Sequence, residues 1–115
     1  EDRVRVGGLV GIHQFVRVGA HAMIGAHSMV TQDVPPFFLV NGNPAHAYGV
    51  NIVGLRRDGK SPEVRMEIQR AYKILYRSGF NVSQAIEQME RTLTSIPEIE
   101  HLLRFLRNAE RGICR

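Results

Sequence analysis

Two adjacent side chains, His13 and Gln14, offer hydrogen-bonding groups where the surrounding pattern prefers a small residue. Glycine directly follows the aliphatic residue in three of five repeats, at Gly7, Gly19 and Gly25. His13 follows Ile12 in the same way. A neutral imidazole and an amide suit hydrogen bonds to hydroxyl groups and phosphate oxygens. His13 is therefore a candidate functional residue, and a solvated corner histidine is the alternative.

The other histidines and the single cysteine do not predict a metal or thiol site. His21 and His27 are six positions apart, which in a six-residue repeat places them on adjacent faces. They cannot share one metal ion within a subunit, although zinc between subunits remains an alternative. Cys114 has no partner for an internal disulfide and no ligand at zinc spacing, so we expect a reducing cytoplasm and no bound metal.

Basic side chains crowd the outer side of a predicted helix over residues 62–77, at Arg65, Arg70, Lys73 and Arg77. They outnumber Glu63 and Glu67. Surface ion pairs contribute little, so a solvated face is one interpretation. The other interpretation is a docking patch for an acidic partner, made of Arg70, Lys73 and Arg77.

Composition narrows the class of protein. The chain has 115 residues, of which 43% are hydrophobic and 23% charged, as in one soluble domain or part of one. Its net charge of +4 is spread along the chain, which argues against nucleic-acid binding. We expect no transmembrane segment. The start at Glu1 indicates neither an initiator Met nor a signal peptide, so we expect the chain to begin inside a longer reading frame.

The first third carries a repeat that must position these groups. Every sixth residue is aliphatic, at Val6, Ile12, Val18, Ile24 and Val30. A helix would require spacings of three and four, so the period favours a triangular parallel coil of about 18 residues a turn. Val6 should then stack under Ile24 and Ile12 under Val30. Fewer than two turns are present, so we expect the first turn to expose its core.

The coil is expected to end at Gln32–Pro36, because proline cannot donate to a β ladder. Residues 37–60 are predicted to be a loop-rich connector with one extended piece at 37–40. Three amphipathic helices should follow in residues 61–115, which makes a small helical bundle. Their predicted starts are Ser61-Pro62, an Asn81/Gln84 capping box and Ser95 with Glu98, and Gly112 is the expected end of the last helix.

With these elements placed, the chain closely resembles the C-terminal part of the bacterial UDP-N-acetylglucosamine O-acyltransferase family, over its whole length. The motifs that carry the resemblance are Val10-Gly11-Ile12-His13-Gln14-Phe15, Ile24-Gly25, Gln32-Asp33-Val34-Pro35-Pro36, Gly42-Asn43-Pro44-Ala45, Gly49-Val50-Asn51-Ile52, Gly54-Leu55-Arg56-Arg57 and residues 71–79. Many hexapeptide transferases share Gly-Asn-Pro-Ala, whereas Tyr76-Arg77-Ser78-Gly79 after that exit is more specific.

The resemblance implies a homotrimer of left-handed parallel β-helices followed by a helical domain. Such an enzyme moves a 3-hydroxyacyl chain from acyl carrier protein to the 3-hydroxyl of UDP-N-acetylglucosamine, the first step of lipid A biosynthesis. It uses no cofactor beyond the carrier's phosphopantetheine. Its general base is a histidine in an earlier coil, so we expect no catalytic base in this chain and no activity from the chain alone.

The resemblance also implies roles for single residues. His13 and Gln14 would contact the sugar and phosphate, Asn51 the uridine, and Arg57 the diphosphate. Met23 and Ala26 would line the acyl-chain groove, although packing or an ordinary small residue is the alternative for each. The basic face at Arg70, Lys73 and Arg77 would dock the acyl carrier protein.

The sequence departs from the family pattern at two positions and leaves other functions open. Val53 stands where many relatives have an acidic residue, and Asp58 stands where a second basic residue is usual. An anion beside a diphosphate is unfavourable unless Asp58 points away. A non-catalytic trimerisation or cap module and a coenzyme A-dependent hexapeptide acyltransferase are the alternatives.

Overall fold

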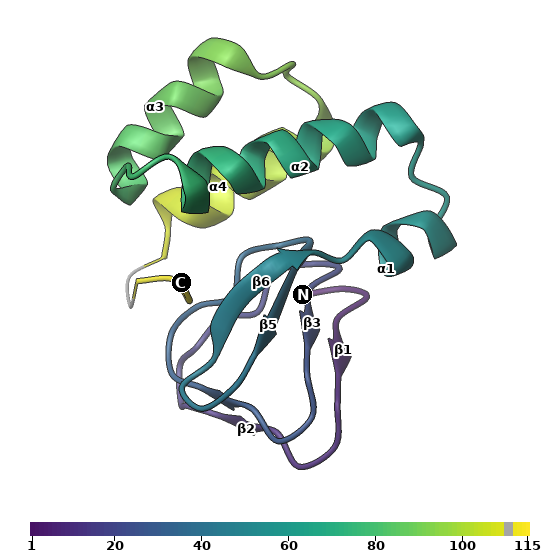
Figure 1. Ribbon diagram of the computed structural model, residues 1–115, viewed down its shortest axis with the longest axis vertical. Coiled ribbons are helices and arrows are strands. Elements are labelled where there is room, and N and C mark those ends of the chain that lie inside the picture. The colour runs from purple at the N-terminus through teal and green to yellow at the C-terminus, as the bar shows by residue number, and fades with distance from the viewer. Residues whose placement is uncertain (110–111) are drawn as a thin grey trace.

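The computed structural model describes residues 1–109 and 112–115, and it gathers the strands on one side and the longer helices on the other (Figure 1). The strands are β1 (Arg5–Val6), β2 (Gly11–Ile12), β3 (Met23–Ile24), β4 (Met29–Val30), β5 (Phe38–Asn41) and β6 (His46–Val50). The helices are α1 (Ile52–Arg57), α2 (Pro62–Arg77), α3 (Val82–Thr92) and α4 (Pro97–Arg107).

The predicted stacking of the repeat is confirmed. β1 pairs in parallel with β3, so that Val6 lies opposite Ile24. β2 pairs in parallel with β4, so that Ile12 lies opposite Val30. A parallel bridge from Val18 to Val34 marks the third face of the coil. One chain turn therefore brings residues 18 positions apart into register on the first two faces.

The coil continues past the predicted exit at Pro35-Pro36, so that prediction is wrong. β5 pairs in parallel with β3, with Met23 opposite Leu39 and a shorter separation of 16 residues. Pro36 lies in the turn before β5, so its missing N–H removes no ladder hydrogen bond. β6 then pairs antiparallel with β5 and ends a mixed sheet of order β1-β3-β5-β6.

The corner glycines are required by close packing between turns and not by a positive φ angle. The positive φ angles of the corners belong to non-glycine residues two positions further on, such as Leu9 (56°) and His21 (60°). Gly7 and Gly19 are instead needed because the next turn passes close by. A Cβ atom on Gly19 would lie 2.3 Å from the backbone nitrogen of Pro36, and one on Gly7 would lie 2.6 Å from that of Ala26.

Two of the predicted helix starts are confirmed. Ser61 caps α2, and its side chain accepts a hydrogen bond from the Val64 N–H at 3.2 Å. Asn81 and Gln84 form the capping box of α3: the Asn81 side chain accepts from the Gln84 N–H at 2.8 Å, and Gln84 Oε1 accepts from the Asn81 N–H at 3.0 Å. Each pair satisfies N–H groups that a helix start leaves free.

The last helix and the connector differ from expectation. α4 is capped by Ile96 without a side-chain hydrogen bond, because the Ser95 hydroxyl donates to Glu100 at 2.8 Å instead. α4 ends at Arg107 with Asn108 as its cap, several residues before Gly112. The connector over residues 37–60 holds β5, β6 and the short helix α1, two of which were missed.

The core has two parts, one inside the coil and one under the helices. The coil core contains Ile24, Val30 and Val34, which are fully buried. The corresponding side chains of the first turn are open, since Val6 is 52% and Ile12 44% exposed, as the repeat count predicted. The second core packs α2, α3 and α4 against one another and against Phe38 of β5.

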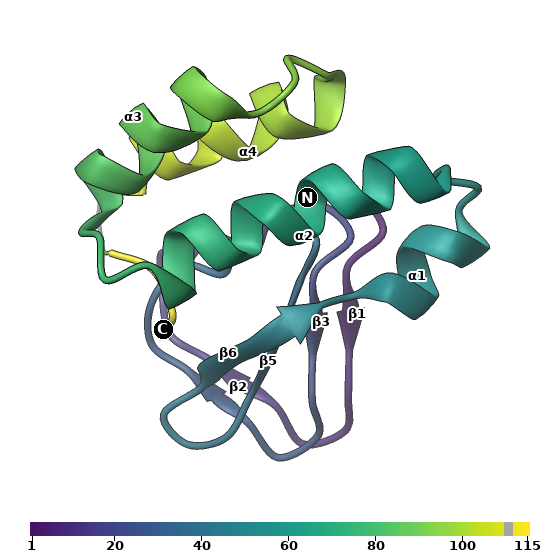
Figure 2. The same cartoon turned by 45° about the horizontal axis from the view of Figure 1, so that its top comes forward.

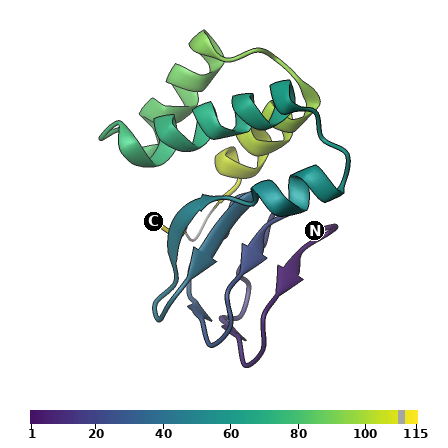
Figure 3. The same cartoon turned by 45° about the vertical axis from the view of Figure 1, so that its right-hand side comes forward.

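Two further connections join the coil to the helical region. The bridge between Asp33 and Ile113 returns the end of the chain to the coil, and α1 lies beside β1 and below the start of α2 (Figure 2). The N-terminus lies beside α1 (Figure 3). Within residues 1–109 and 112–115, no helix is long and apolar enough to cross a bilayer.

Candidate functional site

Asn51 fixes α1 to a corner of the coil. Its side chain is buried, and its Oδ1 accepts a hydrogen bond from the Gly54 N–H at 3.1 Å. Its Nδ2 donates to the carbonyl of His21 at 2.9 Å. A Cβ on Gly54 would lie 2.4 Å from Asn51 Nδ2, so glycine is needed there. The Asn51 amide thus makes two hydrogen bonds inside the chain and determines where the neighbouring Arg57 is held.

A pocket of about 500 Å³ opens between this helix and the sheet of the coil. Three of the predicted site residues line it: Met23 from β3, Asn51, and Arg57 from α1. Arg5 of β1 and the apolar side chains of Leu39 and Val53 complete much of its wall. The structure therefore brings a predicted nucleotide pair and a predicted groove residue to one place.

Asp58 does not face this pocket as a free anion. Its carboxylate accepts a hydrogen bond from Arg3 at 3.1 Å, and its other oxygen lies 2.9 Å from His21 Nδ1. His21 in turn stacks on Phe37, with 5.7 Å between ring centroids. The carboxylate is thus held by the coil corner, and Asp58 does not line the 500 Å³ pocket.

The remaining predicted residues lie elsewhere. His13 and Gln14 are exposed at the corner after β2, and the pocket at α1 does not include them. Ala26 is exposed at the corner after β3 and does not line that pocket with Met23. One chain alone therefore does not bring His13 and Gln14 to Arg57.

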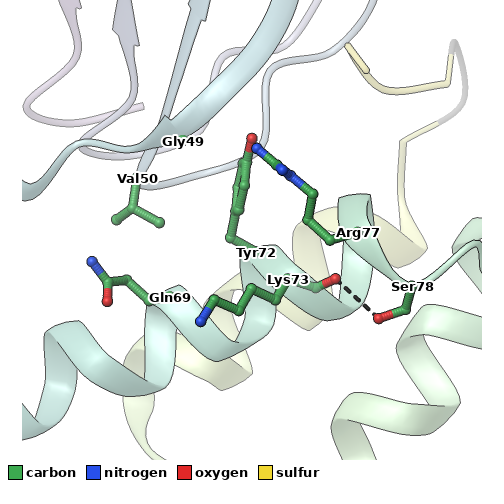
Figure 4. A pocket seen from close by; sticks show the side chains of 7 residues that line it. All are labelled: Gly49, Val50, Gln69, Tyr72, Lys73, Arg77 and Ser78. Atoms are coloured by element: carbon green, nitrogen blue, oxygen red, sulfur yellow. Dashed lines mark hydrogen bonds between the residues drawn. The ribbon is translucent and has the colours of Figure 1, made fainter.

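The basic face of α2 divides into two parts. Lys73 and Arg77 line a second pocket of about 730 Å³ between α2 and β6, with Tyr72 and Gly49 (Figure 4). Near the end of the helix, the Ser78 hydroxyl donates to the Lys73 carbonyl at 3.1 Å. Arg70 faces a different pocket, where it pairs with Glu67.

Buried titratable groups elsewhere serve packing. Glu67 is buried and also accepts a hydrogen bond from the Thr94 N–H at 2.9 Å, which fixes the loop before α4. Burial raises the pKa of Tyr76, whose hydroxyl donates to the Cys114 carbonyl at 2.7 Å. Burial also raises the pKa of the Cys114 thiol. Across the two described segments of the chain, no three His, Cys, Asp or Glu side chains group as metal ligands.

Arg3 and Arg5 were missed as site residues. They occupy outward positions at and before the first strand, where the repeat pattern constrains only the inward residues. The signal that could have found them is that Arg5 falls 18 positions before Met23, hence beside it on the same face.

Comparisons with known proteins identify relatives of this chain. A family model described as UDP N-acetylglucosamine O-acyltransferase, domain 2, matches residues 33–114. The acyl-[acyl-carrier-protein]–UDP-N-acetylglucosamine O-acyltransferase of Thiobacillus denitrificans is 46% identical over 99% of this chain and 44% of its own length. That of Alkalilimnicola ehrlichii is 41% identical over 100% of this chain and 45% of its own length.

Solved structures of the same family superpose closely on this chain. LpxA from Acinetobacter baumannii superposes with a TM-score of 0.95 at 43% identity, over 99% of this chain and 45% of that one. The UDP-N-acetylglucosamine acyltransferase of Arabidopsis gives 0.90 at 31% identity, over 100% of this chain and 43% of that one. The chain thus spans less than half the length of these relatives. Because the family model matches most of it, the chain belongs to the UDP-N-acetylglucosamine O-acyltransferase family.

Proposed function

We propose that this chain is the C-terminal portion of an enzyme that transfers a 3-hydroxyacyl group from acyl carrier protein to the 3-hydroxyl of UDP-N-acetylglucosamine, the first step of lipid A biosynthesis. The observation that carries the proposal is 46% identity to a relative so named over 99% of the chain. The match to a second domain of the family supports the C-terminal placement. The reaction takes place in the cytoplasm and needs no cofactor beyond the carrier's phosphopantetheine.

The fold class of the parent protein is a left-handed parallel β-helix followed by a small α-helical bundle. Its last coils extend beyond residue 36 to β5, whereas β6 and α1 form the connector, and residues 61–115 form the helical domain. The general-base histidine belongs to an earlier coil, so this chain alone is inactive. The exposure of Val6 and Ile12 supports such a coil, because burying them against one removes apolar surface from water.

The active sites lie between subunits of a homotrimer. His13 and Gln14 occupy one corner of the coil, whereas Asn51 and Arg57 occupy another. A closed threefold assembly repeats one interface and can place the first corner of one subunit opposite the second corner of its neighbour. Within that cleft His13 and Gln14 contact sugar and phosphate, Asn51 contacts the uridine, and Arg57 binds the diphosphate. Met23 and Ala26 line the acyl groove.

The acyl carrier protein docks on the basic face of α2. Within the described residues Lys73 and Arg77 form no ion pair, and both are exposed, so they attract an acidic partner without losing an existing contact. Arg70 contributes less because Glu67 already neutralises it. Charge reversal at Lys73 and Arg77 should raise the KM for the carrier severalfold and weaken its salt dependence, whereas Arg91→Glu on α3 should not.

An acyl-transfer assay of the full-length protein tests the function. We expect UDP-3-O-acyl-N-acetylglucosamine to form from 3-hydroxyacyl carrier protein, and His13→Ala to raise the KM for the nucleotide sugar. Transfer from an acyl-coenzyme A with none from the carrier would replace the donor in this proposal. The absence of transfer from either donor would contradict it and favour a non-catalytic cap.

A further inference from the structure

The pocket between α1 and the coil carries two guanidinium groups and no acidic lining residue. Arg5 enters it from β1 and Arg57 from α1. Both side chains are exposed, and neither forms an ion pair with any residue that the structure describes. Two like charges in one pocket repel each other, so the arrangement favours an anionic ligand that neutralises both.

The one carboxylate that could neutralise them is held aside. Asp58 directly follows Arg57, yet its carboxylate is bound by Arg3 at 3.1 Å and lies 2.9 Å from His21 Nδ1. Only 17% of the Asp58 side chain is exposed. A smaller pocket next to the first includes Arg3 together with Arg5 and Arg57, so the positive side chains outnumber the single carboxylate there.

The rest of the pocket is largely apolar. Met23 and Leu39 from neighbouring strands and Val53 from α1 form its walls. The volume of about 500 Å³ suits a ligand of nucleotide size and not only an inorganic ion.

We propose that Arg5 joins Arg57 in binding a phosphate group of a substrate in this pocket, and that Arg3 and His21 are positioning residues that hold Asp58 away from it. This inference rests on the proposed function for the identity of the substrate. Planar guanidinium groups bind phosphate oxygens through two parallel N–H bonds, which an isolated ammonium cannot do. The phosphate belongs to the diphosphate of the nucleotide sugar or to the phosphodiester of the carrier's pantetheine arm.

Calorimetric titration of the full-length protein with pyrophosphate and with UDP-N-acetylglucosamine tests the binding step. Arg5→Gln and Arg57→Gln should each weaken binding of pyrophosphate about tenfold, in line with a charged hydrogen bond, and should weaken binding of the nucleotide sugar equally if its diphosphate binds here. Arg56→Gln is the matched control, because Arg56 is exposed on the same helix and does not line the pocket. Binding by Arg5→Gln that equals binding by Arg56→Gln would overturn the proposal.

Steady-state kinetics separate the two sources of phosphate. If the diphosphate binds here, Arg5→Gln raises the KM for the nucleotide sugar and leaves the KM for the carrier unchanged. If the phosphodiester binds here, the KM for the carrier rises instead. Both results support a phosphate site, and an unchanged KM for both substrates counts against it.

A rescue experiment tests the positioning role of Arg3. Arg3→Gln should weaken pyrophosphate binding severalfold, because the freed Asp58 carboxylate then opposes the anion. Asp58→Asn in the same chain should restore it, which a merely structural loss would not allow. Failure of this rescue would show that Arg3 does not position Asp58.

Pyrophosphate binding does not depend on acyl transfer. A protein that binds pyrophosphate through Arg5 but transfers no acyl group would therefore refute the proposed function and leave this inference standing.

Discussion

The coil and the helical region reach stability by different means. In the coil, each inward side chain depends on the same position one turn away, as Val6 depends on Ile24. In the helical region, each helix begins at its own cap and buries a face against several partners, as Asn81 and Met89 do for α3. A stacked repeat therefore leaves an open end, whereas the helices close their core. The candidate pocket lies between the coil, whose first turn is exposed, and α1, which leads into the helical region.

The largest expected effect is at Phe38, the residue that joins the two regions. It extends from β5 into the helical core, where its ring lies 5.3 Å from Tyr72 and 5.7 Å from Tyr76 between centroids. Phe38→Ala should cost about 3–5 kcal/mol of unfolding free energy by leaving a cavity. Chemical denaturation measures the loss. Phe15→Ala, at a ring that is 75% exposed, should change little; equal losses would show that Phe38 does not join the cores.

A matched valine pair tests the open end of the coil. Val30 is fully buried and Val6 is 52% exposed, although both are inward residues of the repeat. Val30→Ala should cost about 2 kcal/mol in the 115-residue chain and Val6→Ala less than about 1 kcal/mol. In the full-length protein the two costs should become similar. The same gap in both chains would mean that no coil covers Val6.

Close approach between turns is tested at glycine. A Cβ at Gly19 would meet the Pro36 backbone nitrogen at 2.3 Å, whereas nothing lies within 4 Å of one at Gly8. Gly19→Ala should cost about 1–3 kcal/mol because backbone must move, and Gly8→Ala should be nearly neutral. Thermal unfolding of both variants compares them. A neutral Gly19→Ala would contradict the close-contact explanation of the repeat.

The helical region should respond most at its caps. Asn81→Ala removes the side chain that accepts from the Gln84 N–H and leaves only the half of the capping box that the Asn81 backbone N–H makes with Gln84, at a cost of about 1 kcal/mol. Ser95→Ala should cost less, since the Ser95 side chain caps no helix. The thermal unfolding midpoints of the two variants show which substitution costs more stability. The reverse order would restore Ser95 as the start of the last helix.

The smallest effect is electrostatic, at the Lys60–Glu98 pair. Burial raises the pKa of Glu98, but the hydrogen bond from Lys60 at 2.8 Å, a backbone hydrogen bond and the charges of Lys60 and His21 together outweigh it, and the net pKa lies below its ordinary value. The pair therefore stabilises above the unfolded pKa of about 4.3, and this contribution is lost as pH falls through the lowered folded pKa. The midpoint difference between wild type and Glu98→Gln should shrink from pH 7 to pH 3. A constant difference would rule out this ion pair as its source.

The sequence was informative where one rule determines the structure. The six-residue period predicted the register of Val6 and Ile12, and cap residues predicted the starts of α2 and α3. The sequence did not predict features that depend on tertiary contacts. Pro36 marked a turn and not the end of the coil, because the parallel ladder resumes at β5.

The site was harder to predict than the fold. The resemblance pointed to Met23, Asn51 and Arg57, which the structure brings to one pocket. Arg5 was missed because outward positions of a repeat carry no pattern, and the ion pair between Asp58 and Arg3 joins residues 55 positions apart. Only the folded chain shows that Asp58 is held aside.

The most direct test of this account is a structure of the full-length protein with UDP-N-acetylglucosamine bound. We predict a trimer in which the ligand lies between His13 and Gln14 of one subunit and the pocket of Arg5 and Arg57 of its neighbour. A ligand bound within one subunit, or away from Arg57, would contradict it.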